Sequence, residues 1–320
     1  MDIQKHNIFI AFTPFHHYVI NNIINQYFSN DYNCFISTVK GDLIPNKHIF
    51  YIRIRRNMLG IFDMLKAKKI IKKYIMINTT EIFIPHLNQL LTSYIYDLRN
   101  KYLFKISVYY EGIAIFYEIK KKYLERTIIR KLAGIILGYN FKPFPYLFTE
   151  ELKRTAIVYT PIPECTIPFM EKRKISLNSF NIKYALNSLN NILIILPPSI
   201  NKEYYLKRKY ESITKILFNK KYNNYIFYIK PHYNTIRKDY QRVFAELSQN
   251  LGYNRVRSLS PEITVEEFIL TGKFSVIISQ YFSSALINAK LIFNEIEVIL
   301  LEENTIADLN CIIKKINIFT

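Results

Sequence analysis

Short apolar runs, each ending in a polar loop and followed by a helical pattern, recur along the chain. The run Asn7 to Phe12 is rich in β-branched and aromatic residues and too short for a typical helix, which predicts a buried strand. A Thr13-Pro14 loop and a predicted helix from about Tyr18 to Tyr27 follow it. Strand, loop and helix in this order form the first half of a βαβ unit.

The same pattern continues through both halves of the chain. Apolar runs predict strands at 34–38, 50–54, 81–85, 104–110, 191–196, 225–230 and 274–278. Helical spacing predicts helices at about 87–102, 202–220 and 239–251, one around Glu266, and one beginning near Ala285. Strands that alternate with helices favour parallel sheets, so we predict an α/β fold.

The stretch from Leu59 to Lys73 interleaves aliphatic residues with lysines, which predicts a basic amphipathic helix. A solvated helix packed on a sheet is the commoner explanation for such a pattern. Adhesion to an anionic membrane leaflet is the functional alternative. A second basic run extends from Lys120 to Lys131.

Prolines loosen the pattern between Lys131 and Pro168, and the run AIVYTPIPE from Ala156 to Glu164 suggests an extended connector. A chain of 320 residues suits two domains of roughly 150 residues each. We therefore place a boundary near residues 165–185, with one Rossmann-like domain at 1–175 and a second at 176–320.

The composition of the chain is strongly basic. Lys and Arg outnumber Asp and Glu by 44 to 25, giving a formal net charge of +19. Such a charge favours nucleic acid, an anionic membrane surface or anionic substrates. No recognisable nucleic-acid motif accompanies it, so nucleic-acid binding stays a distant alternative.

No uninterrupted apolar stretch reaches the roughly 20 residues that a membrane-spanning helix needs. The N-terminal sequence does not support a secretory signal either. We expect a cytoplasmic protein and leave open peripheral attachment to the inner face of a bacterial inner membrane.

Two predicted strand ends carry candidate chemistry. The strand from Tyr225 ends at Lys230-Pro231-His232, and the strand from Phe104 ends at Glu111-Gly112. In open α/β sheets the carboxyl ends of strands face the ligand crevice, so these side chains are placed to meet an anion or a reacting hydroxyl. Each strand end also has a purely structural explanation. His232 could simply hydrogen-bond a loop carbonyl, and Glu111 could be a surface residue before a turn glycine.

Two further positions carry hydrogen-bonding groups. Ser283-Ser284 opens the predicted helix near Ala285, and the free N–H groups of a helix N-terminus bind phosphate. Ordinary N-capping explains one serine without the other. Thr13 and His16 lie in the loop after the first strand and would face the same crevice, although capping alone accounts for Thr13.

Taken together, these elements resemble the bacterial GT-B sialyltransferases. That group combines an acidic element before Gly, a His-Pro element and a Ser-Ser element. Here the three read Tyr109-Tyr110-Glu111-Gly112, Lys230-Pro231-His232-Tyr233 and Ser283-Ser284, and the opening FTPFH is similar to the lipooligosaccharide sialyltransferases of family 52 and the polysialyltransferases. The resemblance implies a GT-B architecture, two Rossmann-like domains facing each other across a crevice.

The resemblance also implies roles for single residues. Glu111 would be the catalytic base and His232 the acid or phosphate partner, in an inverting transfer of sialic acid from CMP-sialic acid to a cell-surface glycan or glycolipid acceptor. Tyr110, Gly112 and His16 would lie on the acceptor side, in the N-terminal domain. The C-terminal domain would bind the donor, and the donor-binding residues would be Lys230, Glu266, Ser283, Ser284 and Pro261, together with Thr13 from the N-terminal half.

The sequence departs from the family pattern at two positions. Tyr110 stands where a first acid is usual, and Tyr233 replaces the usual Pro after His232, with Pro231 before it. No Asp-x-Asp pair occurs in the chain, so a metal-bridged donor is disfavoured and no metal or other cofactor is expected. A GT-B transferase that uses CMP-Kdo or a UDP-sugar is the nearest alternative, and a homodimer is left open.

Overall fold

The computed structural model of the chain describes most of the sequence and divides it into two compact units. The described residues are 6–38, 49–54, 60–77, 79–99, 101–118, 126–139, 141, 144, 146–177, 190–196, 220–231, 237–260, 265–270, 274–279, 282–301 and 309–317. Unit 1 runs from Met1 to Leu177 and unit 2 from Asn178 to Thr320. The boundary predicted from the sequence lies two residues earlier, after residue 175.

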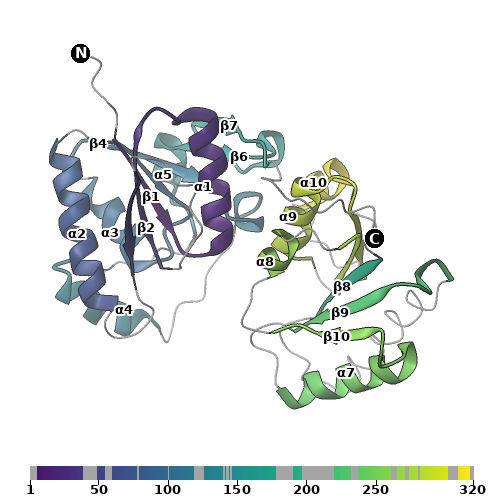
Figure 1. Cartoon of the computed structure of the whole chain (residues 1–320). Coiled ribbons are helices and arrows are strands. Elements are labelled where there is room, and N and C mark those ends of the chain that lie inside the picture. Colours follow the sequence, from purple (N-terminus) through teal and green to yellow (C-terminus); the bar gives the residue numbers. More distant parts are fainter. Residues whose placement is uncertain are drawn as a thin grey trace. The chain divides into compact units, whose positions relative to one another are not determined.

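Unit 1 is built on a parallel sheet whose described strands follow the order β3-β2-β1-β4-β5-β6-β7 (Figure 1). Every strand pair in it is parallel. The strands are β1 (His6–Ala11), β2 (Tyr32–Ser37), β3 (Ile49–Arg53), β4 (Thr79–Ile84), β5 (Lys105–Tyr109), β6 (Ile157–Thr160) and β7 (Glu171–Lys174).

The central strands of unit 1 are buried on both faces. In β1, Ile8, Phe9 and Ile10 are all fully buried. The ring of Phe9 stacks on Phe83 of β4 at 4.3 Å and on Phe35 of β2 at 5.6 Å. A strand enclosed on both sides explains why its sequence is continuously apolar rather than alternating.

Helices cover both faces of this sheet. The helices of unit 1 are α1 (Pro14–Tyr27), α2 (Gly60–Ile77), α3 (Leu90–Leu98), α4 (Arg126–Ile136) and α5 (Glu150–Thr155), with short 3-10 turns η1 (Ile113–Ile115) and η2 (Pro163–Cys165). Right-handed crossovers place α1 on one face, and α2 and α3 on the opposite face, because the chain reverses direction across the sheet after β3. Figure 1 shows α1 and α2 on opposite sides of β1.

One prediction was wrong in this unit. The run Ala156 to Glu164 is not a connector, because Ile157–Thr160 forms β6, which pairs with β5 and with β7. Its four residues are all buried. Pro161 and Pro163 follow the strand and do not interrupt its ladder, so the prolines mark where the strand ends.

Unit 2 contains a second parallel sheet, in the order β10-β9-β8-β11-β12. Its strands are β8 (Asn191–Ile195), β9 (Ile226–Lys230), β10 (Val256–Ser258), β11 (Val276–Ser279) and β12 (Glu297–Leu300). Its described helical elements are η4 (Lys220–Tyr222), α7 (Arg237–Leu251), α8 (Val265–Leu270), α9 (Ser284–Ile292) and α10 (Asn310–Lys315).

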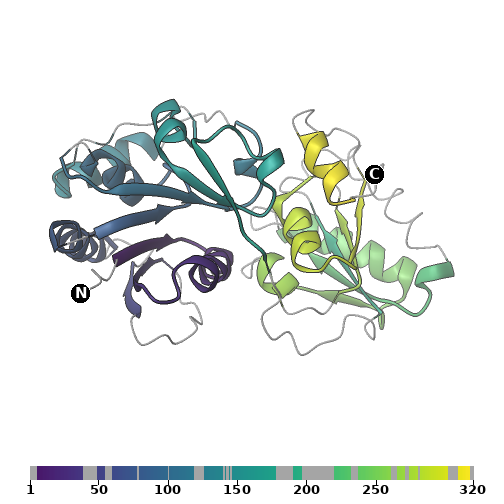
Figure 2. The ribbon, with the colours of Figure 1, turned by 90° about the horizontal axis from the view of Figure 1, so that it is seen from above.

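The core of unit 2 lies where α7 packs on the sheet. Ile192, Ile194, Phe227 and Ile229 from β8 and β9 cluster with Leu247 of α7, all fully buried. The views show α7 on one side of this sheet and α9 on the other (Figure 1) (Figure 2). The predicted parallel α/β architecture is therefore confirmed in both units.

Two expectations cannot be compared with described structure. The helix predicted at 202–220 lies almost entirely outside the described residues, as does the basic run from Lys120 as far as residue 125. Within the described part of the chain, no helix combines the length and apolar character required to traverse a lipid bilayer.

Candidate functional site

The carboxyl edge of the unit 1 sheet gathers the side chains that the sequence marked in the N-terminal half. Thr13 and His16 follow β1, His86 follows β4, and Glu111 follows β5. Because β1, β4 and β5 are adjacent parallel strands, their ends meet at one edge of the sheet.

The central feature of this edge is a pair formed by His86 and Glu111. The Nε2 atom of His86 lies 3.1 Å from Oε2 of Glu111, and their side chains are only 10% and 13% exposed. A polar contact that is largely removed from water is stronger than the same contact at the surface. The pair therefore holds the Glu111 carboxylate in a defined orientation.

The backbone around His86 sets which nitrogen carries the proton. The N–H of Asn88 donates to Nδ1 of His86 at 3.0 Å, so Nδ1 acts as an acceptor. In a neutral imidazole the other nitrogen is then the donor, and Nε2–H points at Glu111. The ring also stacks on Phe12 at 6.1 Å with an interplanar angle of 19°, which fixes its plane.

Gly112 allows the chain to turn directly after Glu111. Its φ is 123° and its ψ is −144°, a region that residues with a Cβ rarely adopt. The chain then enters η1, whose residues Ala114 and Ile115 are buried. The glycine therefore lets the carboxylate sit at the strand end while the following turn packs into the core.

Thr13 and His16 organise the loop after β1. The Thr13 hydroxyl accepts a hydrogen bond from the N–H of His16 at 3.2 Å, which caps α1. The Nδ1 atom of His16 accepts from the N–H of Phe12 at 3.1 Å. Burial, with a smaller effect of His17, lowers the pKa of His16 from 6.5 to about 3, so this ring is neutral.

The two tyrosines before Glu111 are core residues. Tyr110 is fully buried and packs against Phe15 at 5.9 Å and Phe116 at 5.6 Å. Tyr109 is equally buried, and its hydroxyl donates to the carbonyl of Ile10 at 2.5 Å. Burial, reinforced by the charge of Glu111, raises the pKa of Tyr109 well above its usual value. Both rings therefore belong to the core around the end of β5.

In unit 2 the marked residues again occupy the carboxyl edge of the sheet. Lys230 ends β9, Ser283 and Ser284 lie at the start of α9 after β11, and Glu266 lies in the first turn of α8 after β10. Lys230 is 3% exposed, and its ammonium donates to the carbonyl of Pro231 at 2.8 Å. Glu266 accepts from the amide of Asn288 at 3.5 Å, which links α8 to α9.

Ser283 does not cap its helix with its side chain. It occupies the N-cap position with φ −132° and ψ 156°, but its hydroxyl makes no capping hydrogen bond. Its Oγ is shielded from solvent and has no hydrogen-bond partner within the described residues. A buried hydroxyl without a partner is costly, so this atom is available to a ligand at the N-terminus of α9.

Two predicted site residues, His232 and Pro261, lie outside the described residues. Their predicted roles stay predictions. Across the described residues there is no cluster of three or more His, Cys, Asp or Glu side chains that could hold a metal ion.

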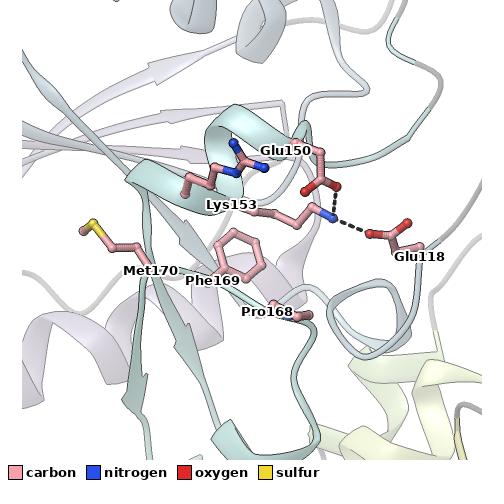
Figure 3. Close-up of a pocket in the computed structure, with 7 residues that line it drawn as sticks. Glu118, Glu150, Lys153, Pro168, Phe169 and Met170 are labelled. Atoms are coloured by element: carbon pink, nitrogen blue, oxygen red, sulfur yellow. Dashed lines mark hydrogen bonds and ion pairs between the residues drawn. The ribbon is translucent and has the colours of Figure 1, made fainter.

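A pocket of about 540 Å³ lies at the opposite edge of the unit 1 sheet (Figure 3). Lys153 and Arg154 precede β6 and Met170 precedes β7, so the pocket is at the amino ends of these strands. The Lys153 ammonium, on a side chain that is 8% exposed, contacts both Glu118 and Glu150. With Arg154 also in the lining, two cations face two carboxylates, and the pocket is separate from Glu111.

His86 was assigned no role from the sequence, although it directly follows the strand predicted at 81–85. The signal that would have identified it is the sheet order, because β4 and β5 are neighbours with Ile84 opposite Val108. Residues just beyond the ends of two neighbouring parallel strands lie within reach of each other. The positions of His86 after one strand and Glu111 after its neighbour would therefore have predicted that the two side chains lie close together.

Comparison with known proteins rests on structure. No protein-family model and no curated protein sequence matches the chain. A UDP-glucosyltransferase from Polygonum tinctorium is similar over 97% of this chain and 82% of its own, with a TM-score of 0.51 and 9% identity. The UDP-GlcNAc 2-epimerase from Methanocaldococcus jannaschii is similar over 94% of this chain and 85% of its own, with a TM-score of 0.50 and 13% identity.

These similarities extend over both units of the chain. At such low identity they concern the arrangement of strands and helices alone. Together with the two parallel sheets, they establish that the chain has the GT-B fold.

Proposed function

We propose that the protein is a glycosyltransferase that uses a nucleotide sugar and in which Glu111 is the general base. The observation that carries the proposal is the buried pair of Glu111 and His86, held at the carboxyl edge of a parallel sheet. Catalytic groups in α/β enzymes concentrate at this edge. A carboxylate fixed there by a neutral histidine donor is suited to accept a proton from an acceptor hydroxyl.

In the proposed reaction the acceptor oxygen attacks the anomeric carbon of the donor sugar. The bond between that carbon and the phosphate oxygen breaks, and its electron pair leaves with the nucleotide. The proton of the acceptor hydroxyl passes to Oε1 of Glu111 while Oε2 keeps its hydrogen bond from His86. His86 is thus a positioning residue rather than a proton carrier.

The proposal assigns the donor nucleotide to unit 2. The N-terminus of α9 offers backbone N–H groups, and the Oγ of Ser283, which has no partner among the described residues, adds a donor for a phosphate oxygen. Glu266 in the first turn of α8 would accept hydrogen bonds from ribose hydroxyls. His232 would assist the departing phosphate, as the motif resemblance implies.

UDP-sugars are the first donors to test. The two structures compared above are named for a UDP-glucosyltransferase and a UDP-GlcNAc 2-epimerase, and both share this fold. CMP-sialic acid is the second candidate, favoured by Glu266 and Ser283-Ser284, which match the donor segment of the sialyltransferases. Neither donor is proposed to require a metal ion.

Thermal unfolding with UDP, UDP-sugars, CMP and CMP-sialic acid, each with chelator, tests the proposal. A ligand at a hundredfold excess over its Kd stabilises the folded state by about 2.7 kcal/mol. We expect one nucleotide to raise the Tm of the wild type and of Glu111→Gln alike. Transfer or donor hydrolysis with that nucleotide should be lost only in Glu111→Gln.

Glu118→Gln is a matched control, because Glu118 lies at the opposite edge of the sheet. It should keep both binding and turnover. If no nucleotide raises the Tm, or if Glu111→Gln turns over as fast as the wild type, the proposed function is wrong. A response to CMP compounds alone would select the second donor class.

A further inference from the structure

Helix α4 presents an apolar stripe to solvent. Leu132, Ile135 and Ile136 are 58%, 70% and 56% exposed. Single exposed aliphatic residues are common on protein surfaces. Here the spacing i, i+3 and i+4 places all three on one side of a helix, where they form a continuous patch.

The opposite side of α4 is packed. A Cβ added at Gly134 would lie 2.7 Å from the carbonyl oxygen of Tyr139, so the helix touches the following loop closely. Leu137, Tyr139 and Phe141 are buried there. Packing therefore accounts for the inner side of the helix and leaves the stripe of Leu132, Ile135 and Ile136 facing outward.

A basic segment of α2 contacts the C-terminal end of this helix. The Lys68 ammonium of α2 donates to the carbonyl of Leu137, the residue next to Ile136, and lies 5.5 Å from the centre of the Tyr94 ring. Desolvation, and then the charges of Lys72 and Lys101, lower the pKa of Lys68. Lys72 lies one helical turn after Lys68 on α2, so these two side chains share one side of the helix. Figure 1 shows α2, α3 and α4 together on the same part of unit 1.

Further exposed apolar and basic residues lie close to these positions in the sequence. Leu103, two residues after Lys101, is fully exposed. Lys131 is exposed and precedes Leu132 in α4. Within the described part of the chain, Lys68, Lys72, Lys101 and Lys131 form no ion pair with a carboxylate. Positive charge that is not neutralised therefore lies beside apolar side chains.

We propose that this surface, the outward stripe of α4 and the lysines beside it, docks on an anionic lipid bilayer. Leu132, Ile135 and Ile136 would enter the boundary between head groups and acyl chains, and the lysines would contact lipid phosphates. The phosphate backbone that lysines bind in nucleic acid offers no apolar surface to an exposed aliphatic stripe, and lysine is depleted from protein–protein interfaces. A membrane surface is the partner that uses both features at once.

Co-sedimentation with vesicles tests the proposal. One set of vesicles is pure phosphatidylcholine and the other contains phosphatidylglycerol. We expect the protein to bind the anionic vesicles at low salt, with little binding to phosphatidylcholine and a marked loss at high salt. The absence of binding to anionic vesicles at low salt would overturn the proposal.

Two variants separate the apolar and the basic contributions. Leu132→Ser with Ile135→Ser should weaken binding at least about tenfold, because two aliphatic side chains leave the bilayer boundary. Lys72→Gln with Lys101→Gln should weaken it about 30-fold at low salt. The two variants change side chains at the surface, so their Tm should match that of the wild type.

Met170→Ser and Tyr253→Ser are matched controls. Both residues are exposed hydrophobics, at 59% and 70%, outside this surface. The controls should bind as the wild type does. Equal binding by the Leu132/Ile135 variant, or self-association in sedimentation velocity that this variant abolishes, would show that the bilayer is not the partner. Nucleotide binding, measured in parallel, does not depend on this surface.

Discussion

Oε2 of Glu111 lies 3.1 Å from Nε2 of His86, and the two residues come from the ends of neighbouring strands β5 and β4. The Nδ1 atom of the same ring accepts from the backbone of Asn88. Three groups in a row, a backbone N–H, an imidazole and a carboxylate, are therefore held in place by the backbone positions of their residues. This arrangement leads to the first prediction.

Replacing His86 should lower turnover without weakening nucleotide binding. A hydrogen bond to a charged group contributes about 1.5–3 kcal/mol, so His86→Ala should reduce kcat roughly tenfold or more. His86→Gln keeps an N–H donor and should recover part of the loss. Steady-state kinetics beside a thermal-shift titration separate the two effects.

Asn88→Ala is the control for this prediction, because the donor to Nδ1 is the backbone N–H and survives the change. It should stay near wild-type turnover. A fall in nucleotide affinity in His86→Ala, with kcat unchanged, would contradict the positioning role.

Gly112→Ala should destabilise the protein and also impair turnover. At φ 123° and ψ −144° a Cβ is strained, at a cost of about 1–3 kcal/mol. Relaxation of that strain would move Glu111, the preceding residue. The free energy of unfolding, measured by chemical denaturation, and kcat should therefore both fall.

Gly138→Asn is a suitable comparison, since Gly138 has φ 63°, a conformation that Asn tolerates. Its effect on the free energy of unfolding should be smaller than that of Gly112→Ala. Equal effects on the free energy of unfolding would mean that the backbone conformation at Gly112 does not require glycine.

Ser283→Ala should weaken nucleotide binding without lowering stability. Its hydroxyl is shielded from solvent and makes no capping hydrogen bond, so its removal should leave the free energy of unfolding unchanged or raise it by about 1 kcal/mol. Thr149→Ala is the contrast, because the Thr149 hydroxyl accepts from the N–H of Leu152 and its loss should cost about 1 kcal/mol. Denaturation curves of both variants measure the free energy of unfolding, and nucleotide titrations measure their affinity.

Stability should fall in mild acid because two buried histidines resist protonation. Burial lowers the pKa of His16 to about 3 and that of His17 to about 4, from 6.5. Their stabilising contribution is complete above pH 6.5 and is lost as the pH falls towards 4, because the unfolded chain takes up protons first. Near pH 5 the loss should be about 2 kcal/mol for each histidine.

His17→Gln should flatten this dependence by removing one titrating group while keeping a polar partner for Ser37, which now lies 2.6 Å from Nε2. Denaturation at a series of pH values measures the slope. An unchanged slope in the variant would assign the acid sensitivity to other groups.

Much of the fold was readable from apolar runs. NILIIL predicted β8, and the aromatic run before Lys230 predicted β9, because buried parallel strands are continuously apolar. β12 was missed, since Glu297–Leu300 alternates between buried and half-buried positions in a short segment. β6 was missed because prolines directly behind it resembled a connector.

The site was less accessible to the sequence than the fold. Glu111 was found because an acid followed by Gly at a strand end is a local pattern. Its partner His86 depends on which strands are neighbours, and local periodicity does not contain that information. The missing cap at Ser283 likewise depends on side-chain orientation.

The buried tyrosines of unit 1 also give the protein an internal optical reporter. The chain has no Trp and 26 Tyr, so tyrosine dominates its near-ultraviolet signal. Tyr109, Tyr110 and Tyr159 stand out among the largest fully buried side chains of the described residues, and all three belong to unit 1. Rigid, asymmetrically packed rings give strong circular dichroism, so changes in this band will report how tightly the core of unit 1 is packed.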